Sequence, residues 1–183
     1  MASGGYKIRN QCGIHFITFA VVEWVDVFTR TAYADIVVQA LKHCQKEKGL
    51  EIYAWCIMSN HVHLIIAAKN ANLSDILRDF KKFTSKAIVK ALLENAGESR
   101  REWMLEIFGR AGAQNSRNQS YQFWQQDNHP IELDTNYMMV QKLDYLHNNP
   151  VKAGIVDEPS DYRYSSARDY EGRVGQLDIL FIE

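Results

Sequence analysis

Two short apolar runs separated by a tight polar turn constrain the fold of this chain more than any other stretch. The runs cover residues 52–58 and 61–68, and Ser59-Asn60 lies between them. Both are rich in residues that favour strands, and turn residues between two such runs are typical of neighbouring strands. The sequence therefore predicts two adjacent strands near the centre of a sheet.

His61 and His63 open the second of these runs. Successive side chains of a strand alternate between its two faces, so both imidazoles should leave the same face of the sheet. This spacing suits two ligands of one divalent cation. The ordinary alternative is a pair of exposed polar positions on a strand with one solvated face. Taken alone, the pair favours the exposed polar positions.

Composition narrows the class of protein. The 183 residues are 46% hydrophobic and 23% charged, which predicts one globular domain with a substantial core. The formal net charge of -1 does not favour strong non-specific nucleic-acid binding, although it allows a local basic face. Three cysteines without C-x-x-C spacing indicate reduced thiols in a cytosolic protein. We expect no membrane partner, because no transmembrane or signal-peptide pattern is present.

The order of predicted elements points to one fold class. Apolar patterns predict strand, helix, strand, strand, helix and strand, at residues 14–22, 32–48, 52–58, 61–68, 73–95 and 121–126. A short helix at 103–108 and a loop rich in Gly, Asn, Gln and Ser precede the last strand. This βαββαβ order predicts an α+β, ferredoxin-like sandwich with a four-stranded antiparallel sheet and two helices on one face.

A further helix, capped by Asp134 or Thr135, should end before Pro150 and lie on the open face of the sheet. We expect a single domain over residues 1–183, with a core at about 14–156 and a C-terminal extension at 157–183. The apolar stretch at 177–182 could pair with a second subunit or pack on its own domain, and the sequence does not decide between them.

Tyr145 and Asn149 form a second constellation on this added helix. They are four residues apart and so share one helix face. An amide oxygen is a suitable third ligand for a hard cation such as Mg²⁺ or Mn²⁺, and a phenol can act as a nucleophile on phosphorus. In the alternative, Tyr145 packs in the core and Asn149 is a helix-terminal residue before Pro150. Spacing alone favours that structural interpretation.

Three blocks of this sequence together resemble a known family. Residues 55–66 hold the His-hydrophobic-His strand, residues 144–154 hold a tyrosine helix that ends in Asn-Pro-Val-Lys, and residues 161–167 read Asp-Tyr-Arg-Tyr-Ser-Ser-Ala. This combination resembles the single-tyrosine HUH transposases, and among them the REP-associated tyrosine transposases. The resemblance covers about residues 14–170.

The resemblance implies a site and a reaction. Tyr145 matches the nucleophile, His61 and His63 match two metal ligands, and Asn149 matches the third. The family uses a divalent metal, Mg²⁺ or Mn²⁺, to nick and rejoin single-stranded DNA, often beside a hairpin, through a 5′-phosphotyrosine. Some members are dimers that exchange the tyrosine helix between subunits, so a homodimer is one expectation and action by a single chain is the other.

Contacts to DNA are predicted from charge and aromatic patterns. The polar face of the helix at 73–95 could follow phosphates, and an aromatic residue near position 124 could stack on an unpaired base. The candidates are Arg78, Lys81, Lys82, Lys86 and Trp124. The alternatives are a solvated helix face and core aromatics.

Two further functions compete with a transposase. A domesticated, non-catalytic relative would keep the fold and bind hairpin nucleic acid. A metal-dependent phosphodiesterase would use water in place of Tyr145. A covalent protein–DNA adduct discriminates among the three, because only the transposase forms one.

Overall fold

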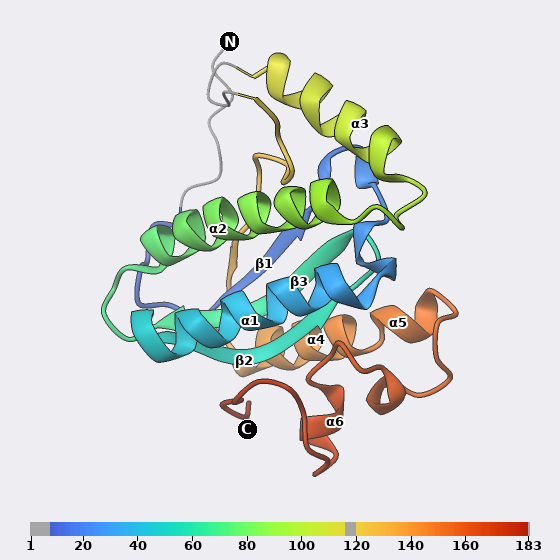
Figure 1. The fold of residues 1–183 in the computed structure, drawn as a ribbon. Helices are drawn as coiled ribbons and strands as arrows, with labels where there is room; N and C mark the ends of the chain where they lie inside the picture. Colours follow the sequence, from blue (N-terminus) through green and yellow to red (C-terminus); the bar gives the residue numbers. More distant parts are fainter. Residues whose placement is uncertain (1–7, 116–119, 183) are drawn as a thin grey trace.

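The computed structural model describes residues 8–115 and 120–182 (Figure 1). Its longer elements are β1 (His15–Ala20), α1 (Thr31–Lys48), β2 (Leu50–Ile57), β3 (His61–Ala68), α2 (Leu73–Glu94), α3 (Arg101–Ala113), β4 (Ile131–Glu132) and α4 (Asn136–His147). Its short helices are η1 (Val22–Trp24), η2 (Val27–Thr29), α5 (Asn149–Lys152), η3 (Pro159–Asp161) and α6 (Ala167–Tyr170).

The four strands form one antiparallel sheet in the order β2-β3-β1-β4. The hairpin of β2 and β3 closes at the predicted turn, where the Met58 amide donates to the His61 carbonyl over 2.8 Å. This strand order and the element order confirm the ferredoxin-like α+β fold. They also place β3 between two neighbours, so its histidines are held in a central strand.

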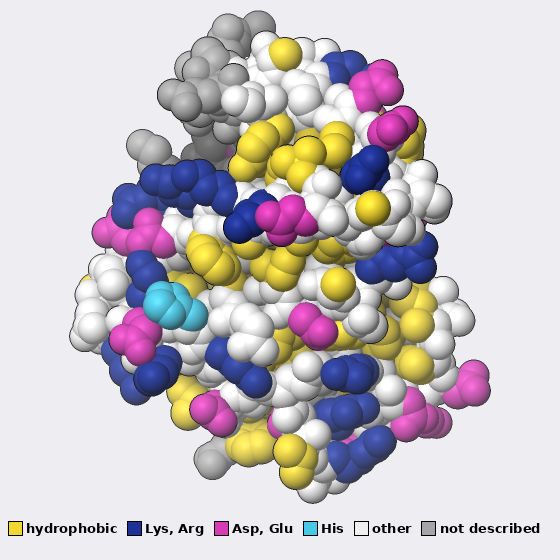
Figure 2. All heavy atoms as spheres, in the orientation of Figure 1, with side chains coloured by type: hydrophobic (Ala, Val, Ile, Leu, Met, Phe, Trp, Pro, Cys, Tyr) yellow, Lys and Arg dark blue, Asp and Glu magenta, His cyan; other side chains and the backbone are white. Residues whose placement is uncertain are grey.

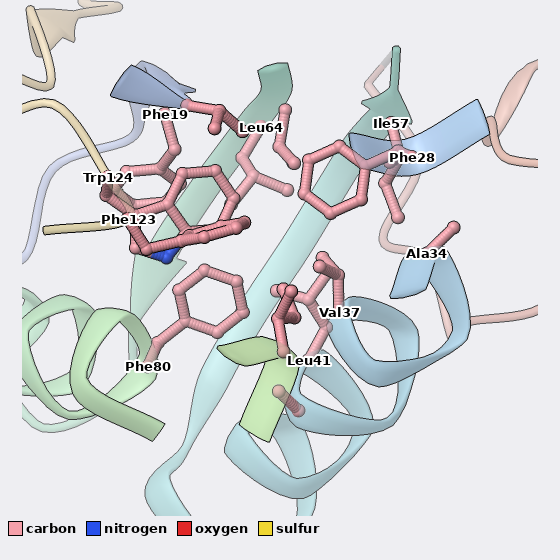
Figure 3. Close-up of a cluster of buried hydrophobic side chains, with 14 of the residues drawn as sticks. Phe19, Phe28, Ala34, Val37, Leu41, Ile57, Leu64, Phe80, Phe123 and Trp124 are labelled. Atoms are coloured by element: carbon pink, nitrogen blue, oxygen red, sulfur yellow. The ribbon is translucent and has the colours of Figure 1, made fainter. Parts of the chain in front are cut away.

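Helices cover both faces of the sheet. α1 and α2 cover one face of the sheet, and α4 packs against β2 and β3 on the other (Figure 1). The larger core lies under α1 and α2, where Phe19, Leu64, Phe80 and Trp124 converge (Figure 3). A smaller cluster, which includes Leu146, lies under α4. The added helix therefore occupies the open face, as predicted.

Local signals set the ends of α1 and α4. Gly49 follows α1 with a φ of 72°, the left-handed conformation that a helix C-cap needs and glycine adopts readily. Thr135 caps α4, since its hydroxyl accepts from the Met138 amide. α4 ends at His147, before Pro150, as predicted.

The predicted strand at residues 121–126 is wrong. Only Trp124 in that stretch forms a bridge, to Val21, and the fourth strand is β4, which pairs with His15 and Phe16. Phe123 and Trp124 are neighbours in sequence and are both buried, so the alternation of a half-buried strand is absent. Core burial of an aromatic pair overrides the local strand pattern.

The short helix predicted at 103–108 is longer in the structure, where α3 runs from Arg101 to Ala113. It takes in the start of the stretch expected to be a loop. Part of that loop, residues 116–119, lies outside the described residues.

The C-terminal extension covers the outer edge of β2. The Ile57 amide donates to Tyr164, Ser166 donates to Trp55, and Leu180 donates to Ile52, over 2.8, 2.9 and 2.9 Å. Leu177 is buried in the larger core. The apolar tail thus packs on its own chain, and it shields backbone groups that an open edge would expose.

Cys44 and Cys56 are buried and Cys12 is exposed; all three are free thiols. Across residues 8–115 and 120–182, no helix combines the length and hydrophobicity needed to cross a bilayer.

Candidate active site

The residues of β3 alternate between the core and the candidate site. Val62 and Leu64 are fully buried beneath α1 and α2, while His61 and His63 lie on the α4 side. The two imidazole centroids are 4.6 Å apart with an interplanar angle of 73°. Strand geometry therefore holds the pair close together, as the spacing predicts.

Hydrogen bonds orient both rings in a way that suits a cation. His61 Nδ1 lies 2.7 Å from Asn60 Oδ1, and because an amide oxygen only accepts, Nδ1 carries the proton and Nε2 keeps its lone pair. His63 Nδ1 lies 2.9 Å from Thr18 Oγ1, which can accept in the same way. His63 Nε2 is buried, with no hydrogen-bond partner in the described part of the chain. An unpaired nitrogen of this kind is suited to ligate a metal.

The protonation state of the pair also fits metal binding. Burial lowers the pKa of His61, and it lowers the pKa of His63 to about 3, because a second positive charge beside His61 and Lys142 is also unfavourable. Both rings are therefore neutral near pH 7. Neutral imidazole is the form that binds a metal ion.

Tyr145 reaches the pair from α4. Leu146, fully buried beside it, fixes the helix on the sheet, and the Tyr145 residue remains 42% exposed. Its centroid lies 5.5 Å from that of His63 and 5.9 Å from that of Phe16. Tyr137, the rival on the same helix, is 76% exposed. Among the described tyrosines, Tyr145 is the one in ring contact with the histidine pair.

Asn149 follows Tyr145 by one helical turn. Asn148, between α4 and α5, keeps helical backbone angles, and the Asn149 Nδ2 donates to the Tyr145 carbonyl over a long 3.5 Å. The amide oxygen takes no part in this bond. In the described residues no group of three or more His, Cys, Asp or Glu could hold a metal. Asn149, predicted as a third ligand from the resemblance, lies at the start of α5, one turn beyond Tyr145 on α4, the helix that packs against the strand of the histidine pair.

Two lysines beside Tyr145 were missed by the sequence reasoning. Lys142 Nζ lies 5.5 Å and Lys152 Nζ 5.7 Å from the centre of the Tyr145 ring. Lys142 also lies 5.0 Å from the centre of the Phe16 ring. The position of Lys142 three residues before Tyr145 is a signal that could have found it, because that offset shares a helix face. Lys152 lies on α5, beyond the predicted end of the helix, so no helical spacing pointed to it.

The cations predicted on α2 lie across the sheet from the histidines, because α2 covers the opposite face. Arg78 pairs with Asp75 and Asp79. Lys81 Nζ donates to the Gln125 carbonyl and to Asn128 Oδ1, both over 2.8 Å, and burial lowers its pKa to about 8.

Lys82 and Lys86 lie on the same helix as Arg78, beside the groove between α1 and α2. Figure 2 views this face and shows basic, acidic and hydrophobic side chains interspersed. The structure does not bring the four cations predicted on α2 together with the candidate site.

The prediction that Trp124 stacks on a base is wrong. Its side chain is in the core, with the residue 4% exposed, and Nε1 donates to Thr84 Oγ1 over 2.9 Å (Figure 3). Its ring centroid lies 5.9 Å from that of Phe19 and 5.8 Å from that of Phe28. A base cannot reach that ring, so the alternative interpretation, a core aromatic, is correct.

Known proteins define the family of this chain. A protein-family model described as "Transposase IS200 like" matches residues 9–108, which are 100 of the 183 residues and include both histidines of the pair. The chain therefore belongs to the IS200-like transposase family, which confirms the resemblance seen in its sequence. Tyr145 lies beyond the matched range. No curated protein sequence matches the chain.

Solved structures extend the likeness of fold. A REP-associated tyrosine transposase bound to a REP hairpin aligns with a TM-score of 0.65 at 18% identity, over 100% of this chain and 94% of that one. A candidate transposase from Deinococcus radiodurans R1 aligns with a TM-score of 0.46 at 17% identity, over 81% and 97% of the two chains. The first alignment shows that the fold is shared along the whole chain.

Proposed function

We propose that this protein is a tyrosine transposase that nicks and rejoins single-stranded DNA through a 5′-phosphotyrosine on Tyr145. The observation that carries the proposal is the position of Tyr145. Its ring is partly exposed and lies 5.5 Å from that of His63 in the same chain, whose fold is that of a transposase family.

The reaction is a transesterification at phosphorus. The Tyr145 hydroxyl oxygen forms a bond to the scissile phosphorus, and the bond from phosphorus to the 3′ oxygen breaks. The phenol releases its proton to solvent, and the departing 3′ oxygen takes one up. The phosphotyrosine keeps the phosphodiester bond energy, so the 3′-hydroxyl of a new end can reverse the step without a further energy source.

Charges around Tyr145 suit a phosphate. His61, His63 and Asn149 would hold Mg²⁺ or Mn²⁺, which when bound supplies positive charge that polarises the scissile phosphate. The ammonium groups of Lys142 and Lys152 flank the tyrosine ring and would meet the charge that develops on the phosphate oxygens. These lysines replace the α2 cations as the proposed phosphate contacts.

The proposed substrate is single-stranded DNA next to a hairpin. The structural relative was solved with a REP hairpin, and the local lysines offer a basic site on a chain of near-neutral net charge. A net charge near zero would limit non-specific binding along ordinary duplex DNA.

We further propose that one chain is sufficient for cleavage. Tyr145 contacts His63 within a single chain, and the C-terminal tail covers the free edge of β2. Mixing His63→Gln with Tyr145→Phe tests this directly, because neither variant has a complete site. We expect no adduct from the mixture, whereas a restored adduct would mean that the tyrosine helix is donated between subunits.

A covalent-trapping assay tests the reaction. Single-stranded hairpin DNA from the flanks of the gene, labelled at either end, is incubated with the protein with and without Mn²⁺. We expect a metal-dependent adduct that retains only the 3′ label. Tyr145→Phe should abolish it, and Tyr137→Phe, a change at an exposed tyrosine on the same helix, should leave it intact.

Two results would contradict this mechanism. Cleavage that survives Tyr145→Phe would mean that water is the nucleophile and that the protein is a phosphodiesterase. Hairpin binding without cleavage or adduct under all metal conditions would identify a non-catalytic binding module.

A further inference from the structure

Trp24 is an exposed tryptophan at the edge of the candidate site. It is 54% exposed, and its ring centroid lies 5.8 Å from that of His61 in an edge-on contact. Tyr145 contacts the other histidine of the pair, His63. The histidine pair is thus flanked by an accessible indole on one side and an accessible phenol on the other.

The backbone that carries Trp24 is strained. Glu23 and Trp24 have φ values of 51° and 55°, so two consecutive non-glycine residues occupy the left-handed region. A bulky side chain rarely adopts that conformation, and residues of this kind concentrate at functional sites. At this strained turn the Trp24 side chain is exposed to solvent.

Contacts from two other segments hold this turn in place. Arg110 Nη2 on α3 donates to both carboxylate oxygens of Glu23, over 2.9 and 3.0 Å, and Asn60 Nδ2 donates to the Trp24 carbonyl over 3.1 Å. Asn60 also accepts from His61 Nδ1. One side chain therefore positions both the indole and a candidate metal ligand, which fixes Trp24 relative to the site.

We propose that Trp24 is a stacking platform for an unpaired base of the single-stranded DNA beside the scissile phosphate. This inference rests on the proposed function, because it assumes that the scissile phosphate binds at the site formed by His61, His63 and Tyr145. A flat, exposed indole held rigidly offers a face to any base that is not already stacked. Bases inside a duplex stack on one another, so the platform selects single strands.

The test measures binding apart from chemistry. Fluorescence anisotropy of a labelled single-stranded hairpin substrate is recorded without added metal in Tyr145→Phe protein, which cannot form the proposed adduct. In this background, failure of the stacking proposal and failure of the proposed nucleophile are distinguishable.

Trp24→Ala should weaken binding of the single strand about 10-fold, in the range expected for loss of one stacked base. Trp24→Phe should restore most of the affinity, because it keeps an aromatic face. Trp103→Ala, a change at a tryptophan that is 51% exposed on α3, should leave affinity unchanged. A duplex of the same length should bind the parent protein and the Trp24→Ala variant equally, because its bases are already stacked.

An abasic scan identifies the stacked base and needs no variant at Trp24. Removing one base at a time should reveal a single position whose loss weakens binding about 10-fold, and Trp24→Ala should add little at that position. The proposal is overturned if Trp24→Ala binds the single strand like its parent, or if no abasic position weakens binding.

Discussion

The two faces of the sheet are built from the same strands but differ in how far their residues are exposed to solvent. Beneath α1 and α2, Phe19, Leu64 and Trp124 are at most 4% exposed and form a closed apolar core. On the α4 side a smaller apolar cluster is also buried, but His61 is only half-buried and Tyr145 on α4 is 42% exposed. One face supplies stability through burial, and the other keeps polar groups accessible at its rim.

The alternation of β3 makes this division possible. Its even-numbered side chains join the core and its odd-numbered histidines open toward α4, so a rigid central strand carries the candidate site. Lysines on the two sides also differ. On the α2 side, Lys81 donates a hydrogen bond to the Gln125 carbonyl. On the α4 side, Lys142 lies beside the rings of Phe16 and Tyr145. Lysines on the two sides of the sheet therefore have different surroundings, which their residue type alone does not reveal.

The largest expected difference between the faces is in stability. Trp124→Ala should lower the free energy of unfolding by about 3–5 kcal/mol, because it removes a buried indole and its hydrogen bond to Thr84. Tyr145→Ala should cost about 1 kcal/mol, since that ring is partly exposed. Urea unfolding of both variants measures the contrast, and equal losses would contradict it.

Metal binding should depend on one face only. His63→Gln should weaken Mn²⁺ binding at least about 100-fold, because it removes a candidate ligand whose Nε2 is buried and unpaired in the described structure. His43→Gln, at an exposed histidine on α1, is the matched control. Calorimetric titration with MnCl₂ reports both affinities. An unchanged affinity in His63→Gln would show that His63 is not a metal ligand.

The lysines give a smaller contrast in rate. Lys142→Gln should slow adduct formation roughly 10- to 100-fold, because it removes an ammonium group near the proposed nucleophile. Lys82→Gln on α2 should leave the rate unchanged. Single-turnover assays at several salt concentrations separate the variants. A larger effect from Lys82→Gln would mean that the phosphates of the DNA contact the lysines of α2.

The most gradual effect concerns the half-buried Lys81 of the core face, whose contribution changes slowly with pH. Burial lowers the pKa of Lys81 to about 8, below its unfolded value of about 10.4, so between these pH values the unfolded chain binds more protons. The contribution of Lys81 to the free energy of unfolding should therefore rise with pH in this window, by about 1 kcal/mol per pH unit. This contribution is lost as the pH falls through the pKa that Lys81 has in the folded chain.

Comparing the wild type with Lys81→Met isolates this contribution from other groups that titrate in alkali. Urea unfolding at a series of pH values across this window should show a difference between the two proteins that changes steadily with pH. A constant difference would show that Lys81 is not desolvated in the folded chain.

Much of the fold could be predicted because its signals are local. The bounds of β3, the end of α1 at Gly49 and the cap at Thr135 all follow from neighbouring residues. β4 could not be found in this way, since its two residues are a strand only because β1 lies beside them. The strand predicted at residues 121–126 was wrong for a similar reason, because Phe123 and Trp124 are placed by their burial in the tertiary structure and not by the local pattern.

The candidate site was predictable where spacing along one element sufficed. Strand and helix periods predicted only that His61 and His63 share a face and that Tyr145 and Asn149 share another. The resemblance of three blocks joined them into one site, and the fold brings the histidines and the tyrosine together. The role proposed for Trp24 depends on left-handed backbone angles and on Asn60, which is 36 residues away. No sequence period carries that information.

The measurement that tests the central claim most directly is the location of the bound nucleotide. After trapping with Mn²⁺, the DNA is digested with nuclease, the protein is cleaved with trypsin, and tandem mass spectrometry locates the added mass. Cleavage after Lys142 and Lys152 yields a peptide of residues 143–152 whose single tyrosine is Tyr145. We predict the nucleotide on that residue. A nucleotide on Tyr137, or DNA cleavage with no modified peptide, would contradict the account.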